Sequence, residues 1–258
     1  MTSISAQAVA ELRARTGVSI LACKQALEEA EGDQEKAIEI LRKRGMAQAV
    51  KKADRDQTEG AFFIASSAAK AACVQLKCET DFVARSDDFI GIGEKIAKAF
   101  HDSGEAAMKT EAEALLPAAV QKLGENITLG ENTIMEAASV GSYVHSNRKI
   151  AVLVGLDASG KLEAAKDVAM HAAAMNPTYV KAEDVPADVI VKEKEIWKEQ
   201  MKDEKKPPEI LEKIMIGKEK KFREENALLK QVFVKDNQKT VEQYLSGAGV
   251  TAYVRMAI

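Results

Sequence analysis

Few residues in this sequence have the types and spacing that chemistry at a single site requires. The best candidate is the run GLDASGK at residues 155–161, which matches the G-x-x-x-x-G-K pattern of a phosphate-binding loop. The next residue is Leu162, which cannot bind Mg²⁺ as the Ser or Thr of such a loop does. Asp, Ser and Gly are also ordinary turn residues after a strand. The run therefore favours a turn, and direct nucleotide binding is the less favoured alternative.

The histidines and cysteines are scattered along the chain. They are His101, His145, His171, Cys23, Cys73 and Cys78. The histidines share no metal-ligand spacing, and three cysteines without a C-x-x-C pair cannot supply a zinc site or a disulfide framework. The sequence also contains no nucleophile elbow and no glycine-rich dinucleotide loop. We therefore expect no enzyme activity, no metal and no cofactor, and a reducing compartment.

The composition narrows the class of protein. The 258 residues carry 37 Lys and Arg against 40 Asp and Glu, a net charge of −3, so no global basic field attracts DNA or a membrane. A hydrophobic share of 46% excludes general disorder, and an aromatic share of only 5% favours helices packed through small residues. The longest aliphatic run, residues 150–156, is too short to cross a bilayer, and the N-terminus has no apolar signal core. We expect a cytoplasmic protein.

Residues 1–45 have the pattern of three short helices. Helix-capping side chains alternate with turn glycines in the order Ser5, Gly17, Ser19, Gly32, Asp33 and Gly45. Helices of about ten residues need one another to bury their apolar faces, so we expect a compact bundle. Residues 46–57, a helix-prone and charge-rich stretch, form the expected tether. Its basic cluster suits either RNA contact or, as we favour, a solvated helix face.

The middle of the chain has the pattern of a degenerate duplication, with residues 58–140 in the first copy and residues 141–185 and 230–258 in the second. Each copy begins with two expected strands and a helix. In chain order these are 60–64, 72–80 and 88–100, then 141–145, 149–156 and 162–175. Two copies predict a duplicated domain and not a solenoid.

Residues 186–229 are rich in Lys and Glu, with sparse apolar residues. Pro207 and Pro208 interrupt what would otherwise be one long helix, so we expect two antiparallel helices joined there. Ile190, Trp197 and Met201 give the first helix an apolar stripe that the second can match. The projecting hairpin is either a contact or dimer surface or a solvated extension.

The segment TDFVA at residues 80–84 follows the alternating strand directly. Thr80 can cap a single helical turn, and Asp81 then lies near the N-terminus of that turn, where a carboxylate is favoured. Phe82 or Val83 must face outward, and an exposed aromatic beside an acid is typical of an interface anchor. Pattern alone favours the alternative, in which Phe82 folds back onto the local core.

At these residues the chain resembles the bacterial elongation factor Ts family. The shared motifs are LRARTG (residues 12–17), CKQAL (23–27), GDQEKAIEILRKRG (32–45), CETDFVAR (78–85), LGENI (123–127), GSYVH (141–145), AMHAAAMNPTYV (169–180) and QVFVKDNQKTV (231–241). They cover nearly the whole chain, and TDFVA together with LRARTG is especially specific. The chain departs from the family pattern at Ala22, where an acid is usual, and near Gly130 and Glu131, where arginines are usual.

The resemblance implies an α+β fold with a ubiquitin-associated-like three-helix module, a core of two duplicated α/β subdomains with antiparallel sheets, and an inserted coiled-coil hairpin. It implies a guanine-nucleotide exchange factor of translation elongation that binds elongation factor Tu, GDP-bound or nucleotide-free. On this expectation the chain promotes GDP release by displacing Mg²⁺ and disturbing the partner's phosphate-binding loop, without binding nucleotide itself. A homodimer through the core or the hairpin stays open.

The resemblance also assigns roles to individual residues. The loop that enters near the partner's Mg²⁺ site consists of Thr80, Asp81, Phe82 and Val83. Partner contacts are expected at Leu12, Ile20, Leu21, Lys24, Leu123, Gly124, Ile127, His145 and His171. The second subdomain and the hairpin are expected to meet other domains of the partner or a second copy of the chain.

Overall fold

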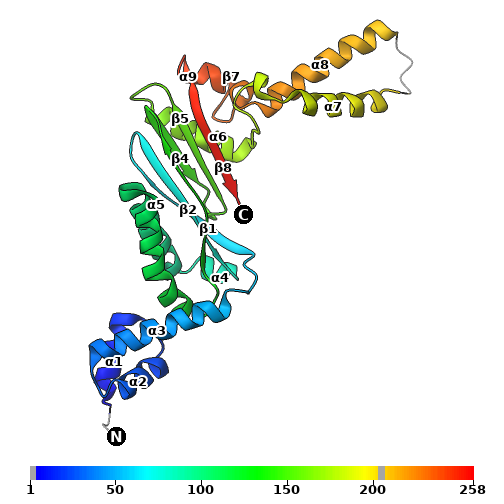
Figure 1. The fold of residues 1–258 in the computed structure, drawn as a ribbon. Helices are drawn as coiled ribbons and strands as arrows, with labels where there is room; N and C mark the ends of the chain where they lie inside the picture. The colour runs from blue at the N-terminus through cyan, green and yellow to red at the C-terminus, as the bar shows by residue number, and fades with distance from the viewer. Residues whose placement is uncertain (1–3, 203–206) are drawn as a thin grey trace.

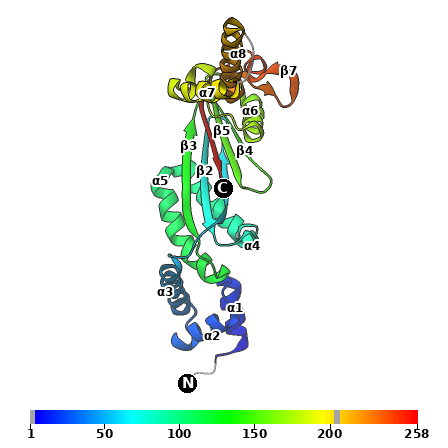
Figure 2. The same cartoon turned by 90° about the vertical axis from the view of Figure 1, so that its right-hand side faces the viewer.

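The computed structural model describes residues 4–202 and 207–258 and has an elongated α+β fold, the class that the sequence predicted. Helices at the N-terminal end lead into a core of two three-stranded antiparallel sheets, and a pair of helices projects from the opposite end (Figure 1). The view turned by 90° has the same end-to-end order (Figure 2).

The N-terminal helices are α1 (Ala6–Thr16), α2 (Ile20–Glu29) and α3 (Gln34–Lys52). They begin after Ser5, Ser19 and Asp33, whose side chains accept hydrogen bonds from backbone N–H groups of the first turn, as predicted. α1 ends at Gly17 in the left-handed conformation, with φ of 68°. The helices meet in one cluster of Val9, Leu12, Val18, Cys23, Ala26, Leu27, Ala30, Ala37 and Leu41.

The prediction that the third helix stops at Gly45 is wrong. α3 continues to Lys52, so residues 46–52 of the expected tether are helical. Gly45 is a packing residue, because a Cβ on it would lie 2.9 Å from the carbonyl oxygen of Pro117 in α5 (Asp87–Leu123). A glycine inside a helix here allows two helices to approach closely.

The first sheet contains β1 (Glu59–Ser66), β2 (Lys70–Cys78) and β3 (Thr128–Glu136), antiparallel and in that order. α5 packs on one face of it, and Gly104, with φ of 82°, divides α5 into two halves. The expected helix over 88–100 lies in the first half, whereas the second half and β3 were not predicted. Both halves contribute to a core that includes Ala61, Phe63, Ala72, Val74, Leu76, Phe89, Ile96, Phe100, Met108 and Val120.

The second sheet repeats this arrangement with β4 (Ser139–Val144), β5 (Ile150–Leu156) and β8 (Val250–Ala257), again antiparallel and in that order. α6 (Leu162–Met175) packs on it over the bounds that the sequence predicted. Each copy thus runs strand, strand, helix, strand. The final strand of each copy is the one that periodicity did not identify.

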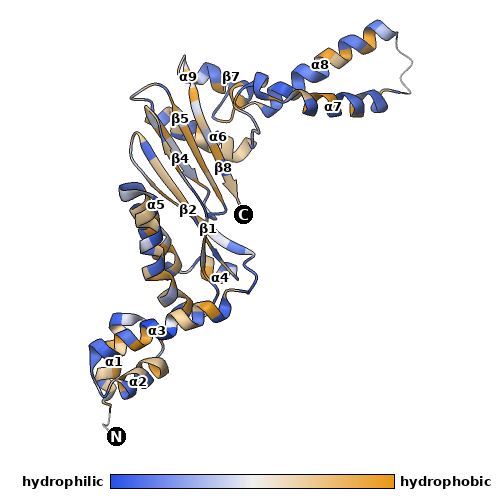
Figure 3. Ribbon diagram, viewed as in Figure 1, coloured by the Kyte–Doolittle hydropathy of each residue, from blue (hydrophilic) through white to orange (hydrophobic). Residues whose placement is uncertain are grey.

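The two sheets contact each other through the faces that the helices leave open. Phe63 belongs to the cluster under α5, whereas its neighbour Phe62 belongs to a cluster between the sheets. That second cluster contains Phe62, Ala71, Cys73, Met135, Val140, Ala151, Leu153 and Met256. Because several strands are buried on both faces, the apolar residues concentrate in the sheets (Figure 3).

An insertion of helices and short strands separates α6 from β8. Its main part is the pair α7 (Ala187–Gln200) and α8 (Pro208–Asn226), which extend side by side away from the core (Figure 1). Its short elements are η1 (Ala182–Asp184), η2 (Leu228–Lys230), β6 (Val232–Phe233), β7 (Asp236–Thr240) and α9 (Val241–Leu245). The connection between α7 and α8 at residues 203–206 lies outside the described residues.

Aromatic and charged contacts join the two projecting helices. The rings of Trp197 and Phe222 meet edge to face at 5.9 Å, and Lys194 pairs with Glu219 at 2.6 Å. Trp197 is buried together with Ile190 and Met201, the other members of the predicted stripe. In the part of the chain that the structure describes, we find no helix both long enough and apolar enough to traverse a bilayer.

Candidate partner-binding surface

The segment at residues 80–84 forms a projecting turn at the end of β2. The single-turn helix α4 (Asp81–Ala84) begins after Thr80, whose hydroxyl oxygen accepts a hydrogen bond from the N–H of Val83 at 3.4 Å. Asp81 lies in the first turn and pairs with Arg85 at 3.0 Å. Ala84 is buried, which orients the turn so that the side chain of Phe82 is 83% exposed. The phenylalanine therefore faces outward.

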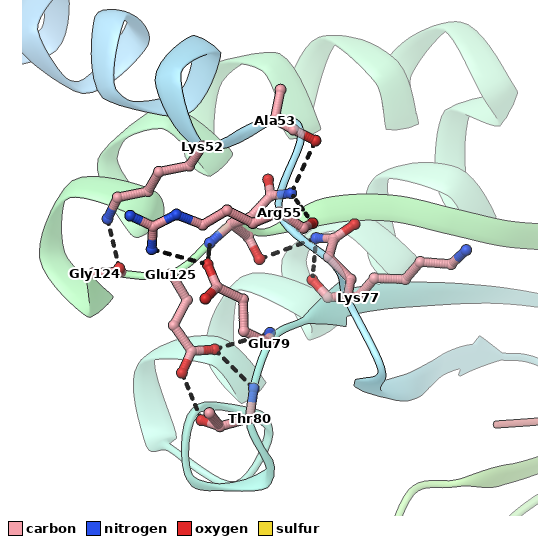
Figure 4. Close-up of polar contacts among 10 residues, drawn as sticks. Lys52, Ala53, Arg55, Lys77, Glu79, Thr80, Gly124 and Glu125 are labelled. Carbon is pink, nitrogen blue, oxygen red and sulfur yellow. Dashed lines mark hydrogen bonds and ion pairs between the residues drawn. The ribbon is translucent and has the colours of Figure 1, made fainter.

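Glu125 braces this turn from the segment that precedes β3 (Figure 4). Its Oε2 accepts hydrogen bonds from the backbone N–H groups of Glu79 and Thr80, both at 3.0 Å. Its Oε1 accepts the hydroxyl hydrogen of Thr80 at 2.5 Å. Hydrogen bonds to a carboxylate are stronger than those between neutral groups, so this brace is firm.

Asn126 links the braced turn to the chain that follows α3. The place where Glu79, Thr80, Glu125 and Asn126 meet is called the corner below. Its backbone N–H donates to Oε1 of Glu79 at 2.7 Å, and its side-chain amide donates to the carbonyls of Ala53 and Arg55 at 3.2 and 3.1 Å. Asn126 is 2% exposed, so these contacts satisfy a buried amide that would otherwise be destabilising. Gln57 completes the network by donating to the carbonyl of Asn126 at 2.9 Å.

The N-terminal bundle attaches to the core at this corner. Lys52, the last residue of α3, donates to the carbonyl of Gly124 at 2.5 Å (Figure 4). The turn after α1 also lies against α5, since a Cβ on Gly17 would meet the Lys122 side chain at 2.7 Å. The bundle and the projecting turn are therefore held by one short stretch of chain.

Cys78 lies beneath the turn as a neutral thiol. Burial, together with the negative charges of Glu125 and Glu59, raises the pKa of its thiol to about 12. The thiol donates to the carbonyl of Thr80 at 3.3 Å. It acts as a packing and hydrogen-bonding group and lacks the low pKa of a reactive cysteine.

Several residues expected to contact a partner have exposed side chains. Ile20 is 59% exposed and Leu21 65% exposed on α2, and Lys24 is exposed one turn later. On the core, Gly124 is exposed and Leu123 is half-buried against the first core cluster. Leu123 and Gly124 belong to the corner described above, whereas Ile20, Leu21 and Lys24 lie on the bundle attached to it.

His145 is exposed but lies apart from that network. It follows β4, and its Nδ1 is 3.2 Å from the hydroxyl of Tyr143. Its backbone closes the turn into β5 by exchanging hydrogen bonds with Ile150 and Arg148. The hydrogen bonds found among residues 4–202 and 207–258 do not connect its side chain to the projecting turn.

Leu12, Ile127 and His171, which the resemblance assigned to partner contacts, are buried and are not exposed to a partner. Leu12 is 0% exposed within the N-terminal bundle, and Ile127 is 3% exposed in the core cluster that Val83 and Leu123 also join. Leu12 is a core residue of the N-terminal bundle, and Ile127 is a core residue of the first copy. A direct contact would require their modules to open.

His171 is 0% exposed within the second copy. Its Nδ1 accepts the N–H of Val234 at 3.2 Å, which places the ring hydrogen on Nε2, 2.9 Å from the side-chain oxygen of Gln231. Burial lowers the pKa of His171, although the contact with Gln231 opposes this shift. We interpret His171 as a neutral structural residue.

Residues 155–161, which match the phosphate-loop pattern, form a turn that hydrogen bonds connect to neighbouring segments. The N–H of Lys161 donates to the hydroxyl of Ser139 at 3.1 Å, so this N–H is not available to bind a phosphate. The carboxylate of Asp157 accepts the N–H of Gly249 at 2.8 Å. Among the described residues, no three His, Cys, Asp or Glu side chains gather as a metal site would require. The geometry agrees with the turn that the sequence favoured.

The brace formed by Glu125 and Asn126 was missed by the sequence reasoning. The family resemblance implies only that residues 123–127 lie in a contact region. The signal available was a Glu-Asn pair between a helix-ending glycine and a strand, a position where polar side chains often bond to backbone. Nothing in the one-dimensional pattern indicated that the backbone they reach is 45 residues or more away.

Comparison with known proteins identifies the family of the chain. A family model described as "Elongation factor TS" matches residues 79–258. A relative from Hahella chejuensis named "Elongation factor Ts" is 44% identical, with 100% of this chain and 93% of the relative aligned. Relatives of the same name from Teredinibacter turnerae and Christiangramia forsetii are 45% and 41% identical, covering 99% and 100% of this chain and 91% and 100% of their own lengths. The chain therefore belongs to the elongation factor Ts family and is a translation elongation factor.

Proposed function

We propose that the chain is a guanine-nucleotide exchange factor that binds GDP-bound elongation factor Tu and promotes the release of GDP. The observation that carries this proposal is Phe82, a ring 83% exposed at the tip of a capped and braced turn. Aromatic side chains held outward are typical anchors of protein interfaces.

The proposed mechanism is coupling between two binding equilibria. Mg²⁺ and the backbone N–H groups of a phosphate-binding loop hold GDP in the partner through charge, so displacing the metal and disturbing that loop weakens GDP binding. Lowering GDP affinity a thousandfold takes about 4 kcal/mol of differential binding. By linkage, bound GDP lowers the affinity of the partner for this chain by the same factor. No covalent bond changes, so the chain is not an enzyme in the usual sense.

A broad contact behind the ring supplies that free energy. We assign the first contact to Ile20, Leu21 and Lys24 on the N-terminal bundle, which we take to be a ubiquitin-associated-like module. Leu123 and Gly124 extend the contact beside the projecting turn, and His145 adds to it from the second copy. Exposed aliphatic side chains on α2 support this assignment, since Ile20 and Leu21 are each more than half exposed.

The second copy and the hairpin of α7 and α8 form the other part of the proposed interaction. We take the hairpin to be a short coiled coil that meets other domains of the partner or a second copy of this chain. Exposed aliphatic residues on it, Val191, Ile196, Ile210 and Ile216, support a contact role. The complex includes the nucleotide-free partner as an intermediate and forms in the cytoplasm, where elongation takes place.

The test is to mix the chain with elongation factor Tu loaded with a fluorescent GDP analogue. An excess of unlabelled GDP captures the emptied partner, and the loss of fluorescence gives the release rate. We expect release to accelerate with the concentration of the chain and to saturate. A release rate that stays at the level of the partner alone would contradict the proposal.

The same mixture distinguishes two other classes of protein. A scaffold or RNA-binding module would leave nucleotide release unchanged. A nucleotide-hydrolysing protein would bind GTP or ATP directly at residues 155–161, which equilibrium dialysis with the chain alone detects. The hydrogen bond from the N–H of Lys161 to Ser139 argues against that site.

A further inference from the structure

The carboxylate of Glu125 accepts three hydrogen bonds at the base of the projecting turn, two from Thr80 and one from Glu79. It accepts the N–H groups of Glu79 and Thr80 at 3.0 Å and the hydroxyl hydrogen of Thr80 at 2.5 Å (Figure 4). Glu125 itself does not belong to the turn, because it lies 45 residues further along the chain. Its side chain therefore fixes the turn to a different part of the core.

The hydroxyl of Thr80 relays this contact into α4. Its hydrogen is donated to Glu125, and its oxygen accepts the N–H of Val83 at 3.4 Å. Since a hydroxyl has one hydrogen and accepting lone pairs, the carboxylate determines which side of the oxygen faces the helical turn. Glu125 thus orients the cap of the turn that carries Phe82.

The base of the brace is firmly held. The N–H of Asn126 donates to the carboxylate of Glu79 at 2.7 Å, while the N–H of Glu79 donates to Glu125. Two hydrogen bonds that run in opposite directions therefore join Glu79 to residues 125–126. The buried amide of Asn126 secures these contacts to Ala53 and Arg55 after α3. Glu125 cannot simply follow a displaced turn.

We propose that Glu125 is a positioning residue that holds the Phe82 turn in its outward geometry during nucleotide release. This inference rests on the exchange function proposed above. Glu125 acts through Thr80, and its own carboxylate is committed to the turn. A ring on a loose turn spends binding free energy on becoming ordered, and less remains for displacing the metal and nucleotide.

The experiment measures release of a fluorescent GDP analogue from elongation factor Tu over a range of concentrations of the full chain. Glu125→Ala is expected to lower the saturating release rate about tenfold, the size of effect that one charged hydrogen bond supports. The half-saturating concentration should stay within about twofold, because the exposed contacts on α2 remain. Glu125→Gln should restore only part of the rate, since its amide oxygen still accepts both N–H groups but its NH₂ group cannot accept the Thr80 hydroxyl hydrogen.

A matched control and a second variant exclude a general loss of structure. Glu136 is an exposed carboxylate in β3 that pairs with Lys70 at 3.3 Å, and Glu136→Ala should release GDP at the wild-type rate. Thr80→Val removes the hydroxyl relay at nearly constant volume and should reproduce the slowing of Glu125→Ala. If Thr80→Val and Glu125→Ala both match the wild-type rate, the positioning role is wrong.

A double-mutant cycle with Phe82→Ala tests whether Glu125 acts through the ring. In the Phe82→Ala background, Glu125→Ala should slow release no further, because the turn no longer carries the ring. Independent effects that multiply would overturn the inference. If Phe82→Ala itself releases GDP at the wild-type rate, the proposed exchange mechanism fails. If Phe82→Ala is slow and Glu125→Ala is not, only the positioning role fails.

Discussion

The backbone of Gly45 lies so close to Pro117 that a Cβ on the glycine would be 2.9 Å from the proline carbonyl oxygen. This contact is between backbone atoms, which cannot move aside as a flexible side chain can. It brings α3 directly against α5 and so determines how the N-terminal bundle attaches to the core. A glycine that sequence patterning assigns to a helix end is here required for helix packing.

Substituting Gly45 tests this packing. In an exposed helix, Gly→Ala stabilises by up to about 1 kcal/mol, but overpacking against fixed backbone costs about 1–3 kcal/mol. We therefore expect Gly45→Ala to lower the free energy of unfolding by about 1 kcal/mol, measured by urea denaturation. Gly91→Ala in α5 is the matched control, because a Cβ there meets nothing within 4 Å and should stabilise slightly. Equal stabilisation by both substitutions would disprove the packing role.

The aromatic contact in the hairpin can be followed with the only tryptophan in the sequence. Phe222→Ala removes the ring that meets Trp197 at 5.9 Å. Because Phe222 is half-buried, we expect a loss of about 2 kcal/mol and a red shift of tryptophan emission as water reaches Trp197. Ile216→Ala, at a side chain 62% exposed, should change stability by less than about 0.5 kcal/mol and leave the emission unchanged. Unchanged emission in Phe222→Ala would show that the two helices separate in solution.

Local signals predicted much of the fold. Ser5, Ser19 and Asp33 cap the first three helices, and the aliphatic run over β5 forms the strand that its residue types favour. α6 has the bounds that the sequence predicted, and in the structure Asn176 ends it in the left-handed conformation. These elements are determined by neighbours in sequence.

The missed elements depend on distant partners. β3 contains Gly130, Glu131 and Asn132, which disfavour strands, and it forms because β2 offers a free edge. β8 occupies the corresponding edge of the second sheet after the long insertion. The contact of α3 with α5 near Gly45 likewise joins segments far apart in the chain. No periodicity within these segments indicates a partner so far along the chain.

The sequence predicted the capped turn of the candidate site but not the contacts that hold this turn in place. The capped turn at Thr80 follows from sequence, but the outward Phe82 was expected only through the family resemblance, since pattern alone favoured an inward ring. The brace by Glu125 joins residues far apart in sequence and was not foreseen. Burial of Ile127 and His171 could not be derived either, because each is surrounded by side chains from several elements.

His171 makes stability depend on pH. Burial lowers the pKa of His171 from its usual value of 6.5, so the unfolded chain binds a proton at higher pH than the folded chain does. Stability is therefore greatest above pH 6.5 and falls as pH decreases toward the folded-state pKa, by at most about 1.4 kcal/mol per pH unit from this group. Urea denaturation at pH 7.5 and 5.5 should show a smaller loss for His171→Gln than for the wild type. Equal losses in both proteins would contradict a buried neutral imidazole.

The cysteines are predicted to be unreactive in the folded chain. Cys23, Cys73 and Cys78 are buried free thiols, and burial raises the pKa of Cys73 to about 12. Since the thiolate is the reactive form, a colorimetric thiol reagent at pH 8 should report no rapid reaction with native protein. All three thiols should react once guanidinium unfolds the chain. One equivalent released at once from native protein would show that a thiol is accessible.

The central claim is that the exposed ring of Phe82 drives nucleotide release, and Phe82→Ala tests it most directly. The measurement is the saturating rate at which elongation factor Tu releases a fluorescent GDP analogue, with Ile134→Ala, at a side chain 40% exposed in β3, as the control. Loss of an interface anchor costs about 2 kcal/mol or more, so we expect Phe82→Ala to slow release about thirtyfold while the complex still forms. The control should match the wild type. A Phe82→Ala protein that releases GDP as fast as the wild type would contradict the account.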